Sequence, residues 1–328
     1  MYVVLAVLDG RFSVGDLALY AGLMFQVQRG IFIVVSNASE LRTVGLATGP
    51  IFRILNLEPE LKDQGGEIVE RDESAIDIDG LSFSYPGETR LVLKDINLRI
   101  RDGETVAIVG ENGAGKTTLV KLLCRLFDPV KGSISWNGMD IREIGLVDLR
   151  RRIGTVMQDF ARFPLSGSEN IGIGSIDNLC DRDAIEAAAT GAGLREVLKT
   201  RPGFMDKHLT RELDDGIELS GGEWQRVALA RAFMRLSRCG LVILDEPTAA
   251  LDPKSEHEIH SLLADIAKDK TSVIITHRLS LARISDRIVV LEDGRVVEEG
   301  THEELMSIKG VYSSMFTRQA IRYTDNQA

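Results

Sequence analysis

The spacing of hydrophobic and polar residues divides the chain into an apolar N-terminal part and a longer globular part. An apolar run covers Leu17–Val35, and Ser36–Leu57 then carries apolar residues at three- and four-residue spacing, which predicts a helix. Glu58–Ser74 is charged and contains a Gly-Gly pair, a composition typical of a linker. From Ile76 onward the pattern is that of a globular domain.

The run Leu17–Val35 is long enough to cross the apolar core of a bilayer, but Gln26, Gln28 and Arg29 interrupt it. An arginine that faces lipid is costly, so we expect Arg29 to face protein, water or the headgroup region. The same pattern also fits a helix buried against a soluble partner, or a helix lying flat on a membrane. Hydropathy alone leaves spanning and non-spanning arrangements open.

In the globular part, short apolar runs alternate with helical patterns. Leu91–Ile100 alternates as a half-buried strand does, and its register slips at Lys94-Asp95, which predicts a turn or bulge. Arg182–Lys199 is rich in alanine and is predicted to be helical. Buried strands are predicted at 104–109, 241–244, 272–276 and 287–291. Strands that alternate with helices indicate an α/β sheet.

The most informative motif is GENGAGKTT at Gly110–Thr118, between the strand predicted at 104–109 and a helix predicted over Thr118–Phe127. Its glycines let the backbone turn so that successive N–H groups point at one anion, and the helix adds its positive end. Lys116 would bring charge to the β- and γ-phosphates, and Thr117 would offer a hydroxyl ligand to Mg²⁺. A Gly-rich turn without a ligand could match the pattern, but the flanking strand and helix favour nucleotide binding.

Polar residues also follow two other predicted strands. Asp245, at the end of the run 241–244, is placed to hold Mg²⁺ through water, and Glu246 could act as a general base on a water molecule. The alternative, that both are solvated loop acids, is disfavoured by the four apolar residues before them. His277 follows 272–276 and could donate a hydrogen bond to a γ-phosphate, although a lone histidine after a strand is more often structural.

A second candidate anion site lies at Leu219–Glu223, which opens a helix predicted to run to Leu236. Ser220 is a good N-cap, and the two glycines after it permit close approach of a ligand. One nucleotide rarely needs two helix ends, so a capped helix start without a ligand is the alternative.

Composition and charge narrow the function classes. The 328 residues are enough for about two domains, and 44% hydrophobic and 27% charged residues are ordinary for a globular protein. The net charge of −10 argues against general binding of nucleic acid, which needs a basic surface, so no nucleic-acid partner is expected. The three cysteines, Cys124, Cys180 and Cys239, have no metal-ligand spacing.

Taken in order, these motifs resemble those of the nucleotide-binding domain of ATP-binding cassette (ABC) transporters, over about residues 76–318. The matching motifs are GENGAGKTT at 110–118 (Walker A), Gln158 in VMQDF (Q-loop), LSGGE at 219–223 (signature), LVILDE at 241–246 (Walker B), AALD at 249–252 (D-loop), His277 (switch histidine) and Tyr85 in FSYPG (A-loop). The resemblance implies an α/β fold: a P-loop NTPase with a RecA-like core, an antiparallel β subdomain and a helical signature subdomain.

The resemblance implies ATP and Mg²⁺ as cofactors. Tyr85 would stack on adenine, and Gln158 would contact Mg²⁺ or the attacking water. Catalytic roles are implied for Glu246, His277 and Gln158, and metal contacts for Thr117, Gln158 and Asp245. Nucleotide contacts are implied for Tyr85, Gly110, Asn112, Gly113, Gly115, Lys116, Thr117, Thr118, Ser220, Gly221 and Gly222.

The resemblance also implies a partner. In this family two such domains close head to tail, so Ser220 and Gly222 of one domain would meet the γ-phosphate held by Lys116 of the other. This arrangement would explain the second anion site. The chain carries one Walker A and one signature motif, so another copy or a related chain is expected, together with the transmembrane helices of an ABC permease.

The N-terminal part is similar to the last transmembrane helix and connecting helix of exporter-type ABC proteins. This implies a partial, mostly helical transmembrane domain at 1–60, a linker at 61–75, the nucleotide-binding domain at 76–318 and a tail at 319–328. The implied function is ATP-driven export across the cell membrane, with the ATPase domain in the cytoplasm. Such exporters carry six membrane helices, and this chain begins near the end of the fifth, so a fragment, a truncated product or half of a split system is expected.

Two departures from the family pattern bear on function. Glu223 stands where glutamine is usual, a change expected to matter little, and TRELDDG at 210–216 matches the acidic exporter loop only loosely. The alternative function is a truncated or regulatory ATPase that binds ATP without transport. A soluble ABC ATPase is disfavoured by the apolar N-terminal runs.

Overall fold

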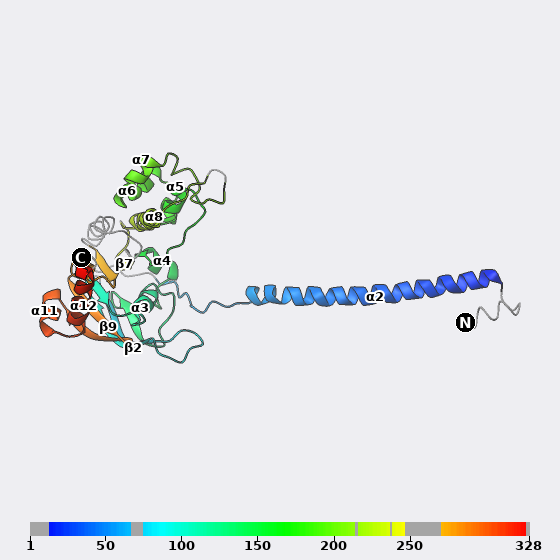
Figure 1. The fold of residues 1–328 in the computed structure, drawn as a ribbon. Helices are drawn as coiled ribbons and strands as arrows, with labels where there is room; N and C mark the ends of the chain where they lie inside the picture. Colours follow the sequence, from blue (N-terminus) through cyan, green and yellow to red (C-terminus); the bar gives the residue numbers. More distant parts are fainter. Residues whose placement is uncertain (1–12, 67–74, 214–215, 237, 247–269, 326–328) are drawn as a thin grey trace. The chain divides into compact units, whose positions relative to one another are not determined.

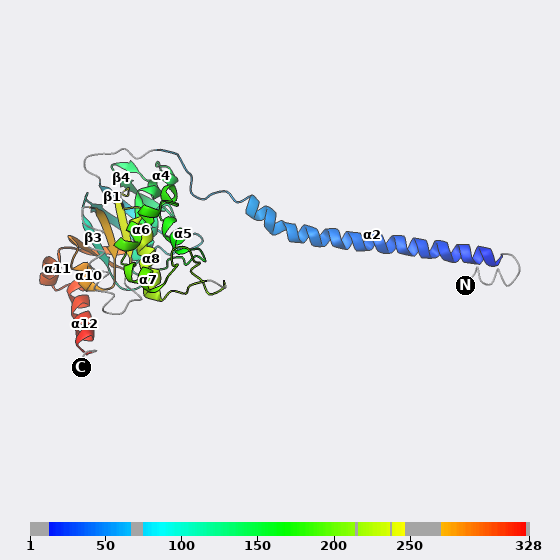
Figure 2. The same ribbon diagram turned by 90° about the horizontal axis from the view of Figure 1, so that it is seen from above.

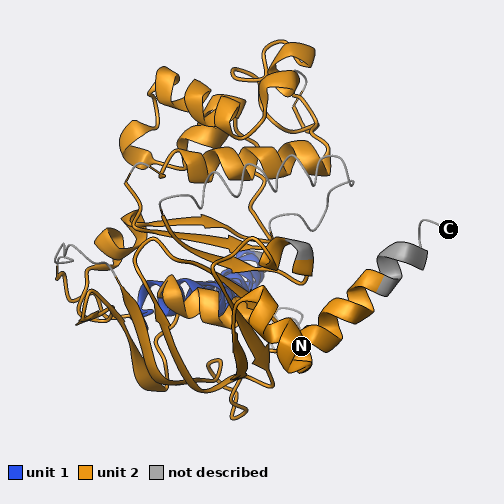
Figure 3. Cartoon of the chain, turned by 90° about the vertical axis from the view of Figure 1, so that its left-hand side faces the viewer, with its two compact units in different colours: residues 1–60 blue, residues 61–328 orange. Residues whose placement is uncertain are grey.

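The computed structural model describes residues 13–66, 75–213, 216–236, 238–246 and 270–325 (Figure 1). The chain divides into two compact units, Met1–Glu60 and Leu61–Ala328, which Figure 3 shows in different colours.

The first unit contains one continuous helix, α2 (Val14–Leu55), which begins with a capping box between Ser13 and Asp16. The apolar run and the separate helix predicted after it therefore form one helix, a correction to the sequence prediction. Nearly all the large apolar side chains described in α2 are exposed, including Phe25 and Phe32. Its length and composition are sufficient to cross a membrane. Its 42 residues span about 63 Å, so only part of it could lie in an apolar core of about 30 Å.

Within the described residues of the second unit, the strands form two sheets. The antiparallel sheet has the order β2-β1-β4-β5, with bounds β1 Ile76–Phe83, β2 Leu93–Ile100, β4 Lys131–Trp136 and β5 Met139–Asp140. The larger sheet has the order β10-β9-β3-β8-β7-β6, with bounds β3 Thr105–Val109, β6 Ile153–Val156, β7 Leu241–Asp245, β8 Thr271–Ile275, β9 Arg287–Glu292 and β10 Arg295–Gly300. All neighbours in it are parallel except β9 and β10.

The bulge predicted at Lys94-Asp95 is present. Leu81 on β1 pairs with Ile96, whereas Phe83, two residues further along, pairs with Leu93. Between these two pairs, β1 advances by two residues and β2 by three, so β2 has one extra residue. Asp95 takes a left-handed φ of 56°.

Some helices of this unit pack on the larger sheet, and others form a cluster of their own. The described helices of this unit are α3 Lys116–Leu123, α4 Leu146–Arg151, α5 Gly167–Gly172, α6 Arg182–Gly191, α7 Arg195–Thr200, α8 Gly221–Phe233, α10 Leu279–Ala282, α11 His302–Ile308 and α12 Val311–Asp325, with a 3-10 turn at Ile176–Asn178. Helices α5 to α8 gather around one apolar core that includes Trp224 (Figure 1). Helices α10, α11 and α12 pack on β3 and β9 through Leu279, Leu305 and Tyr312 (Figure 2).

Two predicted helices and one predicted segment have other bounds in the structure. The helix after the phosphate loop begins at Lys116 and ends at Leu123, because Arg125 adopts a left-handed φ of 45°. The Ala-rich pattern of Arg182–Lys199 is interrupted between α6 and α7, where Gly193 has a φ of 72°. The tail predicted at 319–328 begins inside α12.

Arg125 ties the start of the predicted linker to the end of α3. Its guanidinium is almost fully buried, with Nη2 donating to Lys62 O at 2.8 Å and Nη1 donating to Ile141 O at 3.1 Å and Ile144 O at 3.0 Å. Its Nε donates to Asp128 Oδ1 at 3.1 Å. One side chain thus satisfies three backbone carbonyls and a carboxylate.

We expect Arg125→Met to lower the free energy of unfolding by about 3 kcal/mol, because it leaves buried acceptors and Asp128 without their partner. Methionine resembles arginine in the shape of its side chain, and both residues carry a Cβ that disfavours the left-handed backbone at this position to the same degree. Denaturant unfolding is the measurement. The matched control is Arg99→Met, which breaks an exposed pair with Asp77 and should cost less than about 1 kcal/mol. Equal effects in the two variants would contradict the role of Arg125.

Candidate nucleotide-binding site

The phosphate loop connects the buried strand β3 to α3 by a turn that requires glycine. Gly110, Gly113 and Gly115 have φ values of 156°, 84° and 106°. A Cβ on Gly110 would lie 2.2 Å from Leu291 O, and one on Gly115 would lie 2.6 Å from Leu93 Cδ2. At Gly113 the equivalent position meets no atom within 4 Å. The loop is therefore packed on its inner side and open at its middle, as an anion cradle must be.

Lys116, the first residue of α3, is buried within this loop. Its Nζ donates to Gly110 O at 2.8 Å and to Glu111 O at 3.0 Å. Burial lowers the pKa of the Lys116 ammonium, and the charges of Glu246 and Asp245 partly oppose that effect. The ammonium has three N–H donors, so two can hold it in the loop while the third is directed to a ligand. A bound phosphate would supply the negative charge that this buried cation favours.

Asp245 and Thr117 form the part of the site that fits a divalent cation. Asp245 is the last residue of β7, only 1% exposed, and its carboxylate accepts a hydrogen bond from Thr117. Burial raises the pKa of the Asp245 carboxyl, while the bond from Thr117 partly lowers it. Among the described residues, Oδ1 of Asp245 has no hydrogen-bond partner.

These two residues suit Mg²⁺, which takes oxygen ligands and usually combines one or two protein groups with water and phosphate oxygens. The residues that the structure describes contain no cluster of three or more histidine, cysteine, aspartate or glutamate side chains able to hold a metal. The cation would therefore depend on phosphate and water for its remaining ligands.

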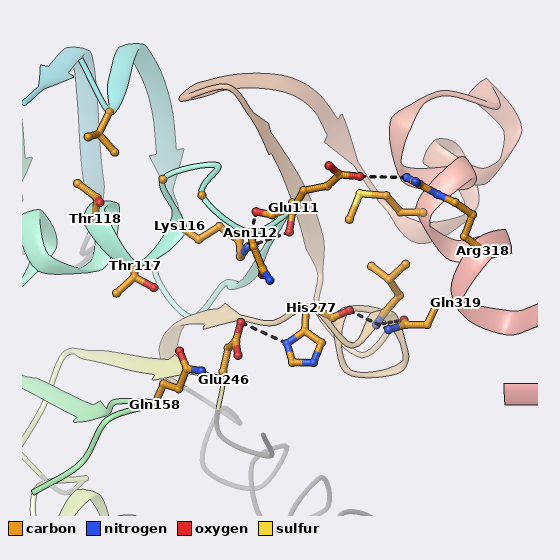
Figure 4. A pocket seen from close by; sticks show the side chains of 16 residues that line it. Glu111, Asn112, Lys116, Thr117, Thr118, Gln158, Glu246, His277, Arg318 and Gln319 are labelled. Carbon is orange, nitrogen blue, oxygen red and sulfur yellow. Dashed lines mark hydrogen bonds and ion pairs between the residues drawn. The ribbon is translucent and has the colours of Figure 1, made fainter. Parts of the chain in front are cut away.

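Glu246 and His277 lie side by side in the cavity lining, with their side chains in contact (Figure 4). Nδ1 of His277 lies 3.2 Å from Oε1 of Glu246. Glu246 has a left-handed φ of 47°, and its N–H donates to Ile275 O at 2.9 Å. Because an ionised carboxylate only accepts, the ring nitrogen that faces it carries the hydrogen.

The cavity has a volume of about 1130 Å³ and collects most of the predicted site residues. Those that line it are Gly110, Asn112, Gly113, Gly115, Lys116, Thr117, Thr118, Gln158, Glu246 and His277. Asp245 is not part of the lining, but it is hydrogen-bonded to Thr117, which is. The signature residues Ser220, Gly221 and Gly222, and Tyr85, are not part of the lining. The predicted D-loop at 249–252 lies outside the described residues.

Tyr85 contacts the phosphate-binding helix instead of the cavity. Its Oη is 3.0 Å from Oγ1 of Thr118, and its ring packs edge-on against Phe83 and Phe127. Stacking on adenine therefore stays a prediction. The hydroxyl contact places the ring beside the phosphate loop, within the antiparallel part of the domain.

Ser220 caps α8 as predicted, and Glu223 closes the cap. Ser220 N donates to the Glu223 carboxylate at 2.7 Å, while Glu223 N donates to Ser220 Oγ at 3.3 Å. Burial raises the pKa of the Glu223 carboxyl, but bonds from Ser220 and Arg201 outweigh it and leave the pKa below its usual value. Arg201 binds both carboxylate oxygens, at 3.0 and 3.1 Å. The carboxylate thus orders the signature segment, a role that the sequence alone did not indicate.

The C-terminal helix contributes cavity residues that the sequence analysis missed. Met315, Arg318 and Gln319 of α12 line the cavity beside Glu111 and His277. No motif marks them, because they lie beyond the last family motif and belong to an ordinary helical pattern.

Residues 93–249 match the model of the family described as ABC transporter. The chain thus carries an ABC transporter domain. It is 35% identical over 311 residues to the ATP-dependent lipid A-core flippase of Methylobacillus flagellatus, covering 94% of this chain and 52% of that protein. It is 35% identical over 315 residues to the subtilin transport ATP-binding protein of Bacillus subtilis, covering 95% of this chain and 50% of that protein.

A solved structure of a bacterial Atm1-family ABC exporter with ATP bound resembles this chain, with a TM-score of 0.77 and 32% identity. The likeness covers 94% of this chain and 53% of that one. The chain thus spans about half the length of the relatives it matches. The predicted family and fold are confirmed: an α/β ABC ATPase domain with an antiparallel sheet and a helical subdomain, preceded by a long apolar helix.

Proposed function

We propose that this chain binds Mg²⁺–ATP and hydrolyses it as the nucleotide-binding domain of an ABC exporter, powering transport across a membrane. One observation carries the proposal: a single cavity joins the glycine cradle and buried Lys116 to the pair formed by Glu246 and His277. The first group can bind a triphosphate, and the second can act on its terminal phosphate. The exporter relatives support the coupling to transport.

In the proposed reaction the cradle and Lys116 hold the phosphates, while Thr117, Asp245 and Gln158 provide positions for Mg²⁺, which would stabilise charge on the phosphate oxygens. Glu246 accepts a proton from the attacking water as general base. His277 keeps the Glu246 carboxylate oriented through its Nδ1 contact, and its ring would donate a hydrogen bond to the γ-phosphate of a bound nucleotide.

A second ABC domain and a membrane domain complete the proposed machine. Ser220 and Gly221 are exposed at the start of α8 and lie outside the cavity of their own chain, so they are free to meet the nucleotide of a partner. Helix α2 would supply the last membrane helix and the connecting helix, with the ATPase domain in the cytoplasm. The partner would be a second copy or a related ABC chain, with further permease helices in the cell membrane.

Turnover as a function of protein concentration tests the proposal. ATP hydrolysis by the purified chain in detergent or lipid should rise more than linearly with concentration, because each site needs a second domain. Absence of ATP binding would contradict the proposal. ATP binding without turnover at any concentration would instead favour the alternative of a regulatory or truncated ATPase.

Mixing two inactive variants tests whether sites are shared. Ser220→Arg should block only the partner's site, and Lys116→Ala only its own. Random pairing of the two variants should therefore restore up to about a quarter of wild-type turnover, through mixed dimers that keep one intact site. Each variant alone serves as the control. Mixtures that stay as inactive as the separate variants would exclude a site shared between chains.

A further inference from the structure

The start of helix α12 is fixed to the larger sheet. The carboxylate of Glu298, on β10, accepts hydrogen bonds from the backbone N–H groups of Val311 and Tyr312, the latter at 2.9 Å. The Tyr312 side chain is fully buried, and its hydroxyl lies 2.9 Å from Nδ1 of His302 on α11. The first turn of α12 is therefore anchored at both backbone and side chain. This anchor also fixes where Gln319, further along the same helix, lies.

Two turns later, Gln319 reaches the loop that carries His277. Its Nε2 donates to His277 O at 2.9 Å, and its Oε1 accepts from Leu279 N at 2.8 Å (Figure 4). A carboxamide that both donates to and accepts from one backbone segment fixes that segment in position and in orientation. The hydroxyl of Thr276 holds the same segment from within, accepting from Arg278 N at 2.9 Å.

The loop needs this support. Helix α10 follows it, begins at Leu279 and has no side-chain cap from its own N-cap residue. Gln319 supplies the missing acceptor for the first N–H of α10. The His277 side chain is 46% exposed, so packing alone does not fix its ring. The position of the His277 backbone therefore largely determines where the ring lies.

We propose that Gln319 is a positioning residue for His277, and that the C-terminal helix is thereby part of the catalytic site; this inference rests on the proposed ATPase function. The neighbouring ion pair between Arg318 and Glu111 is a weaker link. Its two side chains are 65% and 70% exposed and 3.3 Å apart, and exposed pairs of this kind contribute little. The carboxamide of Gln319 is the contact that joins α12 to the histidine loop.

The test substitutes Gln319→Met, which keeps the length and volume of the side chain but removes both hydrogen bonds. The turnover number should fall about tenfold, since a small displacement of a catalytic group is costly. ATP affinity, measured by calorimetry, should be unchanged. The matched control is Thr317→Ala, two residues away on the exposed side of α12, where the hydroxyl bonds only within its own helix. This variant should keep wild-type turnover.

A second background separates positioning from general damage. In a His277→Ala chain, measured by single-turnover kinetics, adding Gln319→Met should cause no further loss, because the group that Gln319 positions is absent. A further tenfold loss in that background would overturn the proposal. Wild-type turnover in the Gln319→Met single variant would overturn it as well.

A spectroscopic measurement on the full chain gives an independent readout. With ¹³C-labelled histidine, the His277 resonance, assigned through His277→Ala, should shift in Gln319→Met and stay unchanged in Thr317→Ala. An unmoved resonance would overturn the proposal. Failure of the proposed function is distinct from each of these results: it would appear as absent turnover in the wild-type chain, or as turnover that survives Glu246→Gln.

Discussion

Glu246→Gln should leave ATP binding intact and lower the rate of hydrolysis by at least about a hundredfold, the usual contribution of a general base. Glutamine has the shape of glutamate, and its carbonyl oxygen can still accept the hydrogen from Nδ1 of His277, now 3.2 Å from Oε1. It cannot take a proton from water. The phosphate loop and Lys116 are untouched, so ATP should bind and the two domains should close without reopening.

Three measurements together check this expectation: steady-state ATPase rate, ATP affinity, and size-exclusion chromatography with and without ATP. A stable dimer that appears only with ATP is the expected third result. The matched control is Glu196→Gln on α7, whose carboxylate is 76% exposed and pairs with Lys199. Wild-type turnover in Glu246→Gln would remove Glu246 from the mechanism and, with it, the main support for catalysis.

Features that depend on a few consecutive residues could be predicted from the sequence. The phosphate loop is one of these, because three glycines, a lysine and a threonine within one stretch fix both its shape and its chemistry. The bulge at Lys94-Asp95 is another, since a slip in alternation is visible without knowing the partner strand. Asp245 and Glu246 follow the same logic, because residues at the end of a buried strand reach the edge of the sheet.

Features that depend on distant contacts could not be predicted. Gln319 is 42 residues from His277, and Glu223 is 22 residues from Arg201, so no local pattern connects either pair. The change from glutamine to glutamate at 223 was expected to matter little, yet the carboxylate makes a two-point contact with Arg201. For Tyr85, the sequence provided the residue type but not the hydrogen bond to Thr118 that orients it.

Helix bounds were wrong where a backbone conformation, and not a hydrophobic pattern, ends or continues the element. The Ala-rich pattern continues past Gly193, but its left-handed φ breaks the helix. The reverse holds in α2, where polar residues around Ser36 change the composition without ending the helix. An exposed helix has no core to constrain its apolar spacing, so composition alone suggested a boundary that the backbone does not have.

Lys116→Ala should weaken ATP binding itself, by at least about tenfold. A hydrogen bond to a charged group contributes about 1.5–3 kcal/mol, and about 1.4 kcal/mol corresponds to a factor of ten in affinity. The loss is direct, because Nζ is the buried cation of the loop and sits between Gly110 O and Glu111 O. Asp245 would also lose a positive charge that lowers its pKa. Calorimetric titration with ATP measures the effect.

Lys116→Arg sharpens this prediction, because it keeps the positive charge. The guanidinium is planar and broad, whereas the space between the two loop carbonyls holds a compact ammonium. We therefore expect Lys116→Arg to restore little of the affinity lost in Lys116→Ala, and the exposed control Lys199→Ala to bind ATP normally. Full affinity in Lys116→Ala would contradict the phosphate-loop assignment. If Lys116→Arg bound ATP with full affinity while Lys116→Ala did not, charge would determine binding, and not the fit of the ammonium to the loop. That result would separate the electrostatic role of this residue from its geometric one.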